Sequence, residues 1–497
     1  MHESGFDLLA AANQEMVDEG FDPNFPEGTK EQLASLRARA EPTRESGVRD
    51  LRELMWSSID NDTSRDLDQL EVAERVSGGI RLLIAIADVD SAVSVDSPID
   101  RHAAAQTTSV YTGIKTFPML PEELSTDLTS LNEAEDRLAV VVEMVVAGDG
   151  SIASSAVYRA LVRNHVQLTY NAVGPWLEGA AAAPSRVTAA AGLDAQLKLQ
   201  DEAAQLLAGE RRRLGAMSID RIEVEAVLSG GRLDGIHSRG KNRATALIET
   251  FMIAANGVMA NTLRAAGVPS LRRVVHIPKR WPRIVELAAR YGEVLPETAD
   301  SGALNSFLER RKAADKVHFE DLSLAVVKLM GSGEYAFARP GDANHGHFAL
   351  SAHDYTHSTA PNRRFADLVT QRLVKHVLVQ EPTPYTDEQL EEIARNCTLR
   401  ENAARKVERV MNKRIAAVAL EHRIGAIFTA IVTGVTPKGV FVRALNPPVE
   451  GLLVQGQKGV DVGDQLKVKL VGTDPRMGHI DFAVEGLMER APEAGER

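Results

Sequence analysis

Residues 57–70 read SSIDNDTSRDLDQL and are the most informative stretch of the chain. Asp66 and Asp68 are two positions apart, so on an extended segment their carboxylates face the same way. Asp60 lies one short loop upstream, from where it can fold back beside them. Hard oxygen ligands that converge in this way suit Mg²⁺, which binds carboxylates together with water and substrate phosphate. The alternative is a solvated acidic loop, and spacing alone favours it because short motifs often match by chance.

Outward from this segment, strand and helix patterns alternate along the chain. Residues 78–90 and 137–152 are rich in β-branched residues and read as strands. Residues 193–213 and 243–265 have the apolar spacing of amphipathic helices. In the second helix the expected core positions are Leu247, Phe251, Ile253 and Met259. These patterns predict one mixed helix-and-sheet region over residues 49–423.

The two ends of the chain have a different character. Residues 1–48 are polar and charged, with a helical pattern over 28–41, and predict a short helical segment. From Gly425 onward, short alternating strands are separated by glycine and proline turns. Roughly five strands in about 60 residues is the size of a small OB-type barrel, which we place at 425–486. Residues 487–497 are expected to form a disordered tail.

Arginines follow a proline turn far downstream, in the sequence APNRRFADL. Arg363 and Arg364 precede a predicted helix, and guanidinium forks match phosphate oxygens bidentately near a helix N-terminus. The alternative is a pair of surface arginines, one of them ion-paired to Asp367. A second basic stretch, residues 400–414, is of a kind that usually forms a solvated helix face. Its cations include Arg405, Lys406, Arg409, Lys413 and Arg414.

Composition sets the outer limits on function. The 497 residues carry a net charge of −12, and Cys397 is the one cysteine, so no intramolecular disulfide can form. The N-terminus does not read as a signal peptide, and the apolar runs, including that around Phe251, read as too short or too charged to span a bilayer. We therefore expect a cytoplasmic protein without membrane contact. The acidic balance argues mildly against nucleic acid, but a catalytic groove needs only local positive charge.

Four histidines have spacings that could bind zinc: His345 with His347, and His353 with His357. No cysteine supports them, and no recognised zinc motif is present. We therefore predict that they are core or hydrogen-bonding histidines.

Taken together, these segments resemble the RNB catalytic domain of the ribonuclease II/ribonuclease R family, from about residue 51 to 423. The matches keep the family's order along the chain, and the barrel looks like the ribosomal S-one type OB-fold of the same family. The resemblance implies an α+β catalytic domain followed by an all-β barrel. The matching segments are SIDNDTSRDLDQL, IAIADVDSAV, TSVYTGIKTFPMLPEELSTDLTSL, DRLAVVVEM, ERRRLGAMSID, LIETFMIAAN, GHFAL and YTHSTAPNRRFADL.

The activity implied by the resemblance is processive 3′→5′ hydrolysis of single-stranded RNA to nucleoside 5′-monophosphates. The implied cofactor is Mg²⁺, with Mn²⁺ as a substitute, the partner is an RNA 3′ end, and we expect a monomer. Retained carboxylates suit metal-assisted phosphodiester hydrolysis.

The resemblance also assigns roles to individual positions. Asp60, Asp66 and Asp68 match metal-binding and catalytic acids, and Gln69 stands at a fourth metal position. Arg363 matches an arginine on the scissile phosphate, with Arg364 as a secondary phosphate contact. The positions that match RNA-binding residues are Tyr111 as an aromatic clamp, Tyr170 near the terminal nucleotide, Ile219 in the GAMSID element and Glu408 at the 3′ nucleotide.

Several departures from the family pattern bear on activity. Gln69 replaces an aspartate, so one metal is expected to bind less tightly. Ile219 stands where an aromatic is common, and Ala360 and Asn362 replace serine and isoleucine. Too few residues precede the catalytic region for the family's tandem cold-shock domains. The rival function, which rests on Gln69, is a catalytically impaired RNB-like protein that binds RNA without turning it over.

Overall fold

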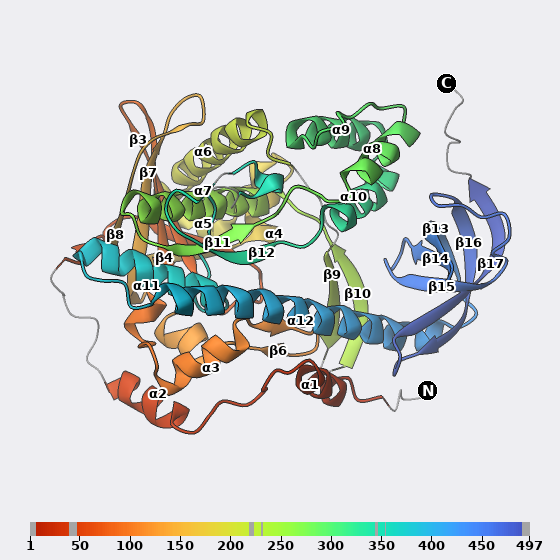
Figure 1. Ribbon diagram of the computed structural model, residues 1–497, viewed down its shortest axis with the longest axis horizontal. Helices are drawn as coiled ribbons and strands as arrows, with labels where there is room; N and C mark the ends of the chain where they lie inside the picture. Colours follow the sequence, from red (N-terminus) through yellow and green to blue (C-terminus); the bar gives the residue numbers. More distant parts are fainter. Residues whose placement is uncertain are drawn as a thin grey trace.

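The computed structural model describes residues 6–38, 47–217, 223–229, 232–342, 346–352 and 354–489. A large mixed helix-and-sheet body is joined to a small all-β barrel, and two helices lie near the N-terminus. Figure 1 shows the barrel at one end of the molecule, with the long helix α12 (Asp387–Leu420) running from the large body toward it. This architecture confirms the predicted fold class.

A six-stranded sheet in the order β1-β8-β2-β3-β4-β7 forms the centre of the large body. The end part of β8 pairs with β2 and its first part pairs with β7, so the strands form a continuous circuit. Its inner strands are apolar because both faces are covered; Leu82–Ala87 are fully buried. The strands predicted at 78–90 and 137–152 are β4 and β7. The bounds are β1 (Arg49–Asp50), β2 (Trp56–Asp60), β3 (Gln69–Val76), β4 (Gly79–Ala87), β7 (Asp136–Val146) and β8 (Ile152–Thr169).

Helices α6 (Leu193–Arg213) and α7 (Arg243–Ala265) pack on this sheet, with the short helices α4 (Tyr170–Leu177) and α5 (Ser185–Ala189) beside them. Both long helices were predicted, but Ile253 is only half-buried, because Ile248 and Ala255 take the core-facing turns of α7. Contrary to the sequence reading, α7 is long and apolar enough to cross a bilayer. Since 61% of its most apolar window is buried inside the protein, it is the core helix of this body.

A second group of elements carries the loops of the candidate site. Ion pairs of a buried arginine join three of these elements. Arg372 of α11, 1% exposed, pairs with Asp90 of η1 at 2.9 Å and with Asp100 of α3 at 2.8 Å. Arg363 and Arg364 directly precede α11, so these pairs also fix their position. The group comprises η1 (Val89–Ser91), α3 (Pro98–Gln106), β5 (Val110–Tyr111), β6 (Thr116–Phe117), η2 (Leu124–Leu128) and α11 (Phe365–Val379).

A helical insertion separates the paired strands β11 (Ser270–Val274) and β12 (Glu334–Ala338). Its helices have their own apolar core, centred on Trp281 and Phe307. The hairpin of β9 (Glu223–Ser229) and β10 (Arg232–Arg239) lies nearby in Figure 1. The helices are α8 (Trp281–Arg290), α9 (Ser301–Ala314) and α10 (Lys316–Met330), and the short η3 (Phe348–Leu350) follows β12.

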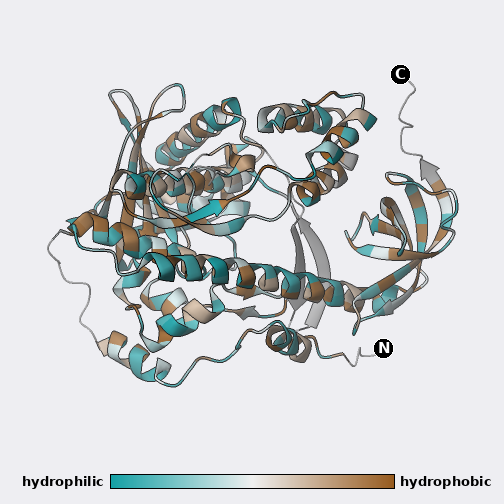
Figure 2. Ribbon diagram, in the orientation of Figure 1, coloured by the Kyte–Doolittle hydropathy of each residue, from teal (hydrophilic) through white to brown (hydrophobic). Residues whose placement is uncertain are grey.

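The C-terminal strands form a closed barrel in the order β13-β14-β15-β17-β16. The rings of Phe428 and Phe482 pack edge to face in its core, with their centroids 6.0 Å apart. Figure 2 shows apolar and polar residues mixed along the barrel strands and α12, as expected for elements with one buried face. Residues 487–489, predicted as the start of a disordered tail, instead continue β17, because they pair with β16. The elements are η4 (Glu421–Arg423), β13 (Ile427–Thr436), β14 (Gly439–Ala444), β15 (Glu450–Gln455), β16 (Gln465–Asp474) and β17 (His479–Glu489).

The N-terminal helices are α1 (Leu8–Asp18) and α2 (Thr29–Ala38). The side chain of Asp7 caps α1 by accepting from the backbone N–H groups of Leu9 and Ala10. The helical pattern over 28–41 predicted α2, whereas α1 was not predicted as a separate helix.

Candidate active site

The acidic segment connects β2 to β3 and returns on itself as the spacing suggested. Asp60 is the last residue of β2, and Gln69 is the first residue of β3. Asp60, Asp68 and Gln69 are buried, with exposed fractions of 8%, 3% and 6%. Asp66 is half-buried and Asp62 is exposed. Most of the segment is therefore not the solvated loop of the alternative interpretation.

Asp68 is held from a distant part of the chain. Its Oδ1 accepts a hydrogen bond from the Asn362 amide at 3.0 Å, and its Oδ2 accepts one from Arg363 Nε at 3.2 Å. Asn362 in turn accepts a hydrogen bond from Thr129 at 2.7 Å. Asn362, which replaces isoleucine in the motif, thus has a structural role, because its amide orients the Asp68 carboxylate. Sequence reasoning noted the substitution but missed this function.

Asp60 is less well satisfied. Its Oδ1 accepts a hydrogen bond from Gln69 Nε2 at 3.1 Å, whereas its buried Oδ2 has no partner. Burial, together with the nearby Asp68 and Asp66 carboxylates, raises the pKa of Asp60 to about 7. Burial likewise raises the pKa of Asp68 to about 6, although the Arg363 charge opposes the change.

Glu71 is a buried acid that sequence reasoning did not single out. It lies on β3, opposite Ser57 of β2, and its carboxylate is fully buried with no partner for either oxygen. Burial, with the charge of Asp60, raises the pKa of Glu71 well above its usual value. Two residues beyond Gln69 on the same strand face, Glu71 adds a further acid behind the candidate site.

No three His, Cys, Asp or Glu side chains among the described residues stand close enough to hold a metal ion by themselves. The donors nevertheless fit a hard divalent cation. A positive charge would relieve the repulsion that Asp68 and Asp66 exert on Asp60, which raises the pKa of Asp60, and would give the partnerless Asp60 Oδ2 a partner. Asp60, Asp66 and Asp68 would supply carboxylates, with phosphate and water completing the set. Gln69 presents its amide nitrogen to Asp60, so it holds that carboxylate in place.

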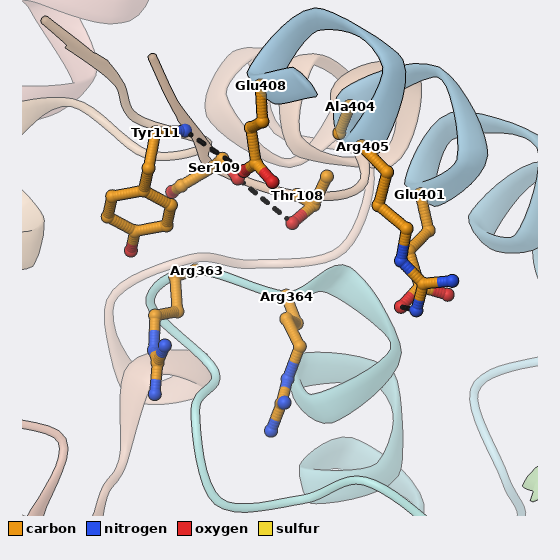
Figure 3. A pocket seen from close by; sticks show the side chains of 9 residues that line it. All are labelled: Thr108, Ser109, Tyr111, Arg363, Arg364, Glu401, Ala404, Arg405 and Glu408. Carbon is orange, nitrogen blue, oxygen red and sulfur yellow. Dashed lines mark hydrogen bonds and ion pairs between the residues drawn. The ribbon is translucent and has the colours of Figure 1, made fainter. Parts of the chain in front are cut away.

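Arg363 and Tyr111 form the open wall of the site. Their side chains are 46% and 43% exposed, and the Tyr111 ring lies beside Arg363 with its hydroxyl toward the guanidinium (Figure 3). An adjacent cavity of about 160 Å³ lies between β5, α12 and the segment before α11. The cavity is lined by Thr108, Ser109, Tyr111, Arg363, Arg364, Glu401, Ala404, Arg405 and Glu408.

Arg364 differs from its neighbour. It makes two hydrogen bonds to Asp367, at 2.8 and 2.7 Å, so the ion pair of the alternative interpretation is present for Arg364. Figure 3 shows both guanidinium groups pointing in one direction. Only the guanidinium of Arg363 is engaged with the acidic segment, through Asp68.

Glu408 faces the same cavity from α12. Its Oε1 accepts a hydrogen bond from the Tyr111 backbone N–H at 3.3 Å, and burial raises its pKa. The structure thus brings Glu408, Tyr111 and Arg363 together. Tyr170 lies at the start of α4, directly after β8, where it packs against the main core. Ile219 lies outside the described residues.

Two of the four histidines, His345 and His353, also lie outside the described residues. His357 bonds the Tyr335 hydroxyl through Nδ1 at 2.8 Å, and its ring packs edge to face on Tyr355. His347 accepts from the Leu350 backbone N–H at 3.2 Å. Burial and neighbouring arginines lower the pKa of His357 well below its usual value and that of His347 to about 4.

Comparisons with known proteins agree on the class of domain. Residues 48–380 match the RNB domain family, and residues 426–485 match the RNase II-type exonuclease C-terminal S1 domain. The chain is 31% identical to Ribonuclease R of Thermotoga maritima, over 93% of this chain and 68% of that protein. It is 29% identical to Ribonuclease R 1 of Lactococcus lactis, over 97% of this chain, but spans only 61% of that protein.

A solved structure gives the same answer. Mycoplasma genitalium RNase R in complex with ribose-methylated single-stranded RNA superimposes with a TM-score of 0.86 at 25% identity. The match covers 96% of this chain and 78% of that chain. The similarity therefore extends over both the large body and the barrel.

Proposed function

The chain belongs to the RNB-domain family of RNase II-type exonucleases, and we propose that it is a Mg²⁺-dependent exoribonuclease that degrades single-stranded RNA processively from its 3′ end. The products would be nucleoside 5′-monophosphates. One observation carries the proposal: Asp68 and the exposed Arg363, 295 positions apart, meet at 3.2 Å beside an exposed tyrosine. An exposed guanidinium next to a buried carboxylate suits a phosphodiester that is approached by both metal and guanidinium.

Each residue of the candidate site has a chemical role in this proposal. A bound Mg²⁺ would activate water and neutralise charge on the leaving oxygen. Asp60, Asp66 and Asp68 would hold it. Arg363 donates to the phosphoryl oxygens as negative charge develops there, and a donor placed at such a charge acts most strongly in the transition state. Exposed Tyr111 provides a ring on which a base stacks.

Glu408 supports the proposed direction of degradation. Its carboxylate lies in the cavity beyond Arg363, within reach of Tyr111. A carboxylate accepts hydrogen bonds from ribose hydroxyls, and a terminal nucleotide is the one that offers a free 3′-hydroxyl. The cavity is therefore a suitable place for the last nucleotide of a chain.

The rival proposal, an RNA-binding protein with impaired catalysis, rests on Gln69. A glutamine that bonds Asp60 removes one negative charge from the candidate metal position. The contact between Asp68 and Arg363 is present despite Gln69, and this favours the catalytic proposal over the rival one. Mn²⁺ is the proposed substitute for Mg²⁺, and we propose a monomer that acts on cytoplasmic RNA.

Product identity tests the proposed function. Incubation of single-stranded RNA with the protein and Mg²⁺, followed by mass spectrometry, should release nucleoside 5′-monophosphates from the first minutes. A substrate with a blocked 3′ end should resist. Release of internal fragments, or of nucleoside 3′-monophosphates, would assign a different reaction. Binding without any product would favour the rival proposal.

A further inference from the structure

Residues 7–38, which we call the N-terminal strap, run past the candidate site, with α1 packed on α12 and α2 packed on α3 (Figure 1). Their apolar side chains do not form a separate core. Instead, strap residues enter one hydrophobic cluster with the β5–β6 ribbon and α12. The buried members of this cluster are Ala12, Met16, Phe21, Val110, Phe117, Ala404, Val407 and Met411.

The basic stretch of α12 meets the strap through charge. Glu19 pairs with Lys406, and Glu15 pairs with Arg414 at 3.1 Å. Arg400 donates to the carbonyl oxygen of Gly20 at 2.6 Å and stacks over Phe21. Part of this stretch therefore packs against the strap within the same chain, which corrects the prediction of a solvated helix face.

A second anchor lies at the other end of the strap. Gln32 donates to Ser97 Oγ at 3.0 Å and accepts from the Ile99 backbone N–H at 3.1 Å. Phe25 packs against His102, with ring centroids 4.5 Å apart. The strap thus spans from the beginning of α3 to the middle of α12.

The ribbon under the strap is too small to be stable alone. It consists of two residue pairs, Val110 with Phe117 and Tyr111 with Thr116, and an isolated two-stranded ribbon is marginal at best. Side chains alternate across a strand. Val110 and Phe117, 0% and 5% exposed, face the strap cluster, whereas Tyr111, 43% exposed, faces the open site.

The other side of the ribbon is tied to the site itself. Ser109 N–H donates to the Arg363 carbonyl at 3.0 Å, and Tyr111 N–H donates to Glu408 at 3.3 Å. Tyr111 therefore stands between two supports, the strap cluster behind it and the Arg363 and Glu408 segments beside it.

We propose that the strap is a positioning element for RNA recognition. Met16 and Phe21 act through Val110 and Phe117 to hold the Tyr111 ring where the base near an RNA 3′ end stacks. The strap therefore determines the affinity for short single-stranded 3′ ends. This inference rests on the proposed function only in placing the RNA end at Tyr111.

A double-mutant cycle on binding tests the inference. The probe is a 5′-fluorescein-labelled oligoadenylate of six nucleotides, and anisotropy is measured with EDTA present so that turnover does not interfere. Met16→Ala should weaken binding about 10-fold, which corresponds to about 1.4 kcal/mol. In a Tyr111→Ala background the same change should have little further effect, because coupled residues give non-additive losses.

Control variants separate positioning from loss of fold. Met16→Leu keeps the apolar volume and should restore wild-type affinity. Leu9→Ala alters α1 at a position that is 47% exposed and should bind as wild type. Phe21→Leu is the milder second variant, should Met16→Ala melt at the assay temperature.

Fully additive losses of Met16→Ala and Tyr111→Ala, or unchanged binding by a folded Met16→Ala protein, would overturn the inference. Nuclease activity is scored separately. A protein that binds the probe with this coupling but never cleaves it would refute the proposed function and leave the strap inference standing.

Discussion

Asparagine at position 60 should stabilise the metal-free protein. The Asp60 carboxylate is buried with one partnerless oxygen, and its pKa is raised from 3.8 to about 7. Each pKa unit corresponds to about 1.4 kcal/mol, so ionised Asp60 costs about 4 kcal/mol of folding stability above pH 7. Asparagine carries no charge, and its amide can still pair with Gln69. We expect Asp60→Asn to gain on the order of 2–4 kcal/mol at pH 8.

The pH dependence has a defined sign. The raised folded-state pKa favours the protonated form in the folded protein, whereas the unfolded chain ionises near pH 4. Stability of the wild type should therefore fall as pH rises from about 4 to about 7, by roughly 4 kcal/mol from this group, and level off above that. In Asp60→Asn this contribution should vanish.

Thermal unfolding at pH 5 and pH 8, with and without Mg²⁺, measures both effects. Asp60→Asn should raise the melting temperature at pH 8 in EDTA by several degrees. Mg²⁺ should stabilise the wild type, and stabilise the variant much less, since one carboxylate ligand is lost. Asp62→Asn, in the exposed part of the same loop, is the matched control and should change neither value. A variant less stable than wild type at pH 8, yet equally stabilised by Mg²⁺, would refute the reasoning.

The other predictions concern rate, binding and metal demand. Arg363→Ala should lower kcat by on the order of 10²-fold or more while leaving the affinity for long RNA nearly unchanged, in single-turnover and filter-binding assays; equal losses in both would assign Arg363 to general binding. Deletion of residues 425–497 should weaken RNA binding and flatten the slope of log affinity against log salt, with single-turnover cleavage largely intact; unchanged binding would exclude the barrel as an RNA anchor. Gln69→Asp should lower the Mg²⁺ concentration for half-maximal rate, because a charged oxygen replaces an amide. If a metal titration shows an unchanged or higher Mg²⁺ requirement, the side chain at position 69 is not a missing metal ligand.

Local patterns predicted the framework well. The β-branched runs over 78–90 and 137–152 became β4 and β7, and the apolar spacing over 193–213 gave α6 with those bounds. Such elements are recognisable from local sequence. A strand that is buried on both faces gives a continuous apolar run, and a helix that is buried on one face gives apolar residues at helical spacing.

Other features were beyond sequence reasoning because they depend on tertiary contacts. Nothing in the local sequence marks Glu71, and only the packing around β3 shows that both its oxygens are buried without partners. The hydrogen bond from Asn362 to Asp68 joins positions 294 residues apart. The packing of α1 on α12 likewise depends on two distant surfaces that meet.

Degradation of a single-stranded RNA labelled at its 5′ end tests the central claim most directly. On a sequencing gel, the wild type with Mg²⁺ should shorten the labelled strand progressively from its 3′ end. EDTA, or the substitution Asp68→Asn, should abolish this shortening while RNA binding persists, because Asp68 is held to engage the ion and Arg363 rather than the strand. Full activity of the Asp68→Asn protein in EDTA would contradict the account.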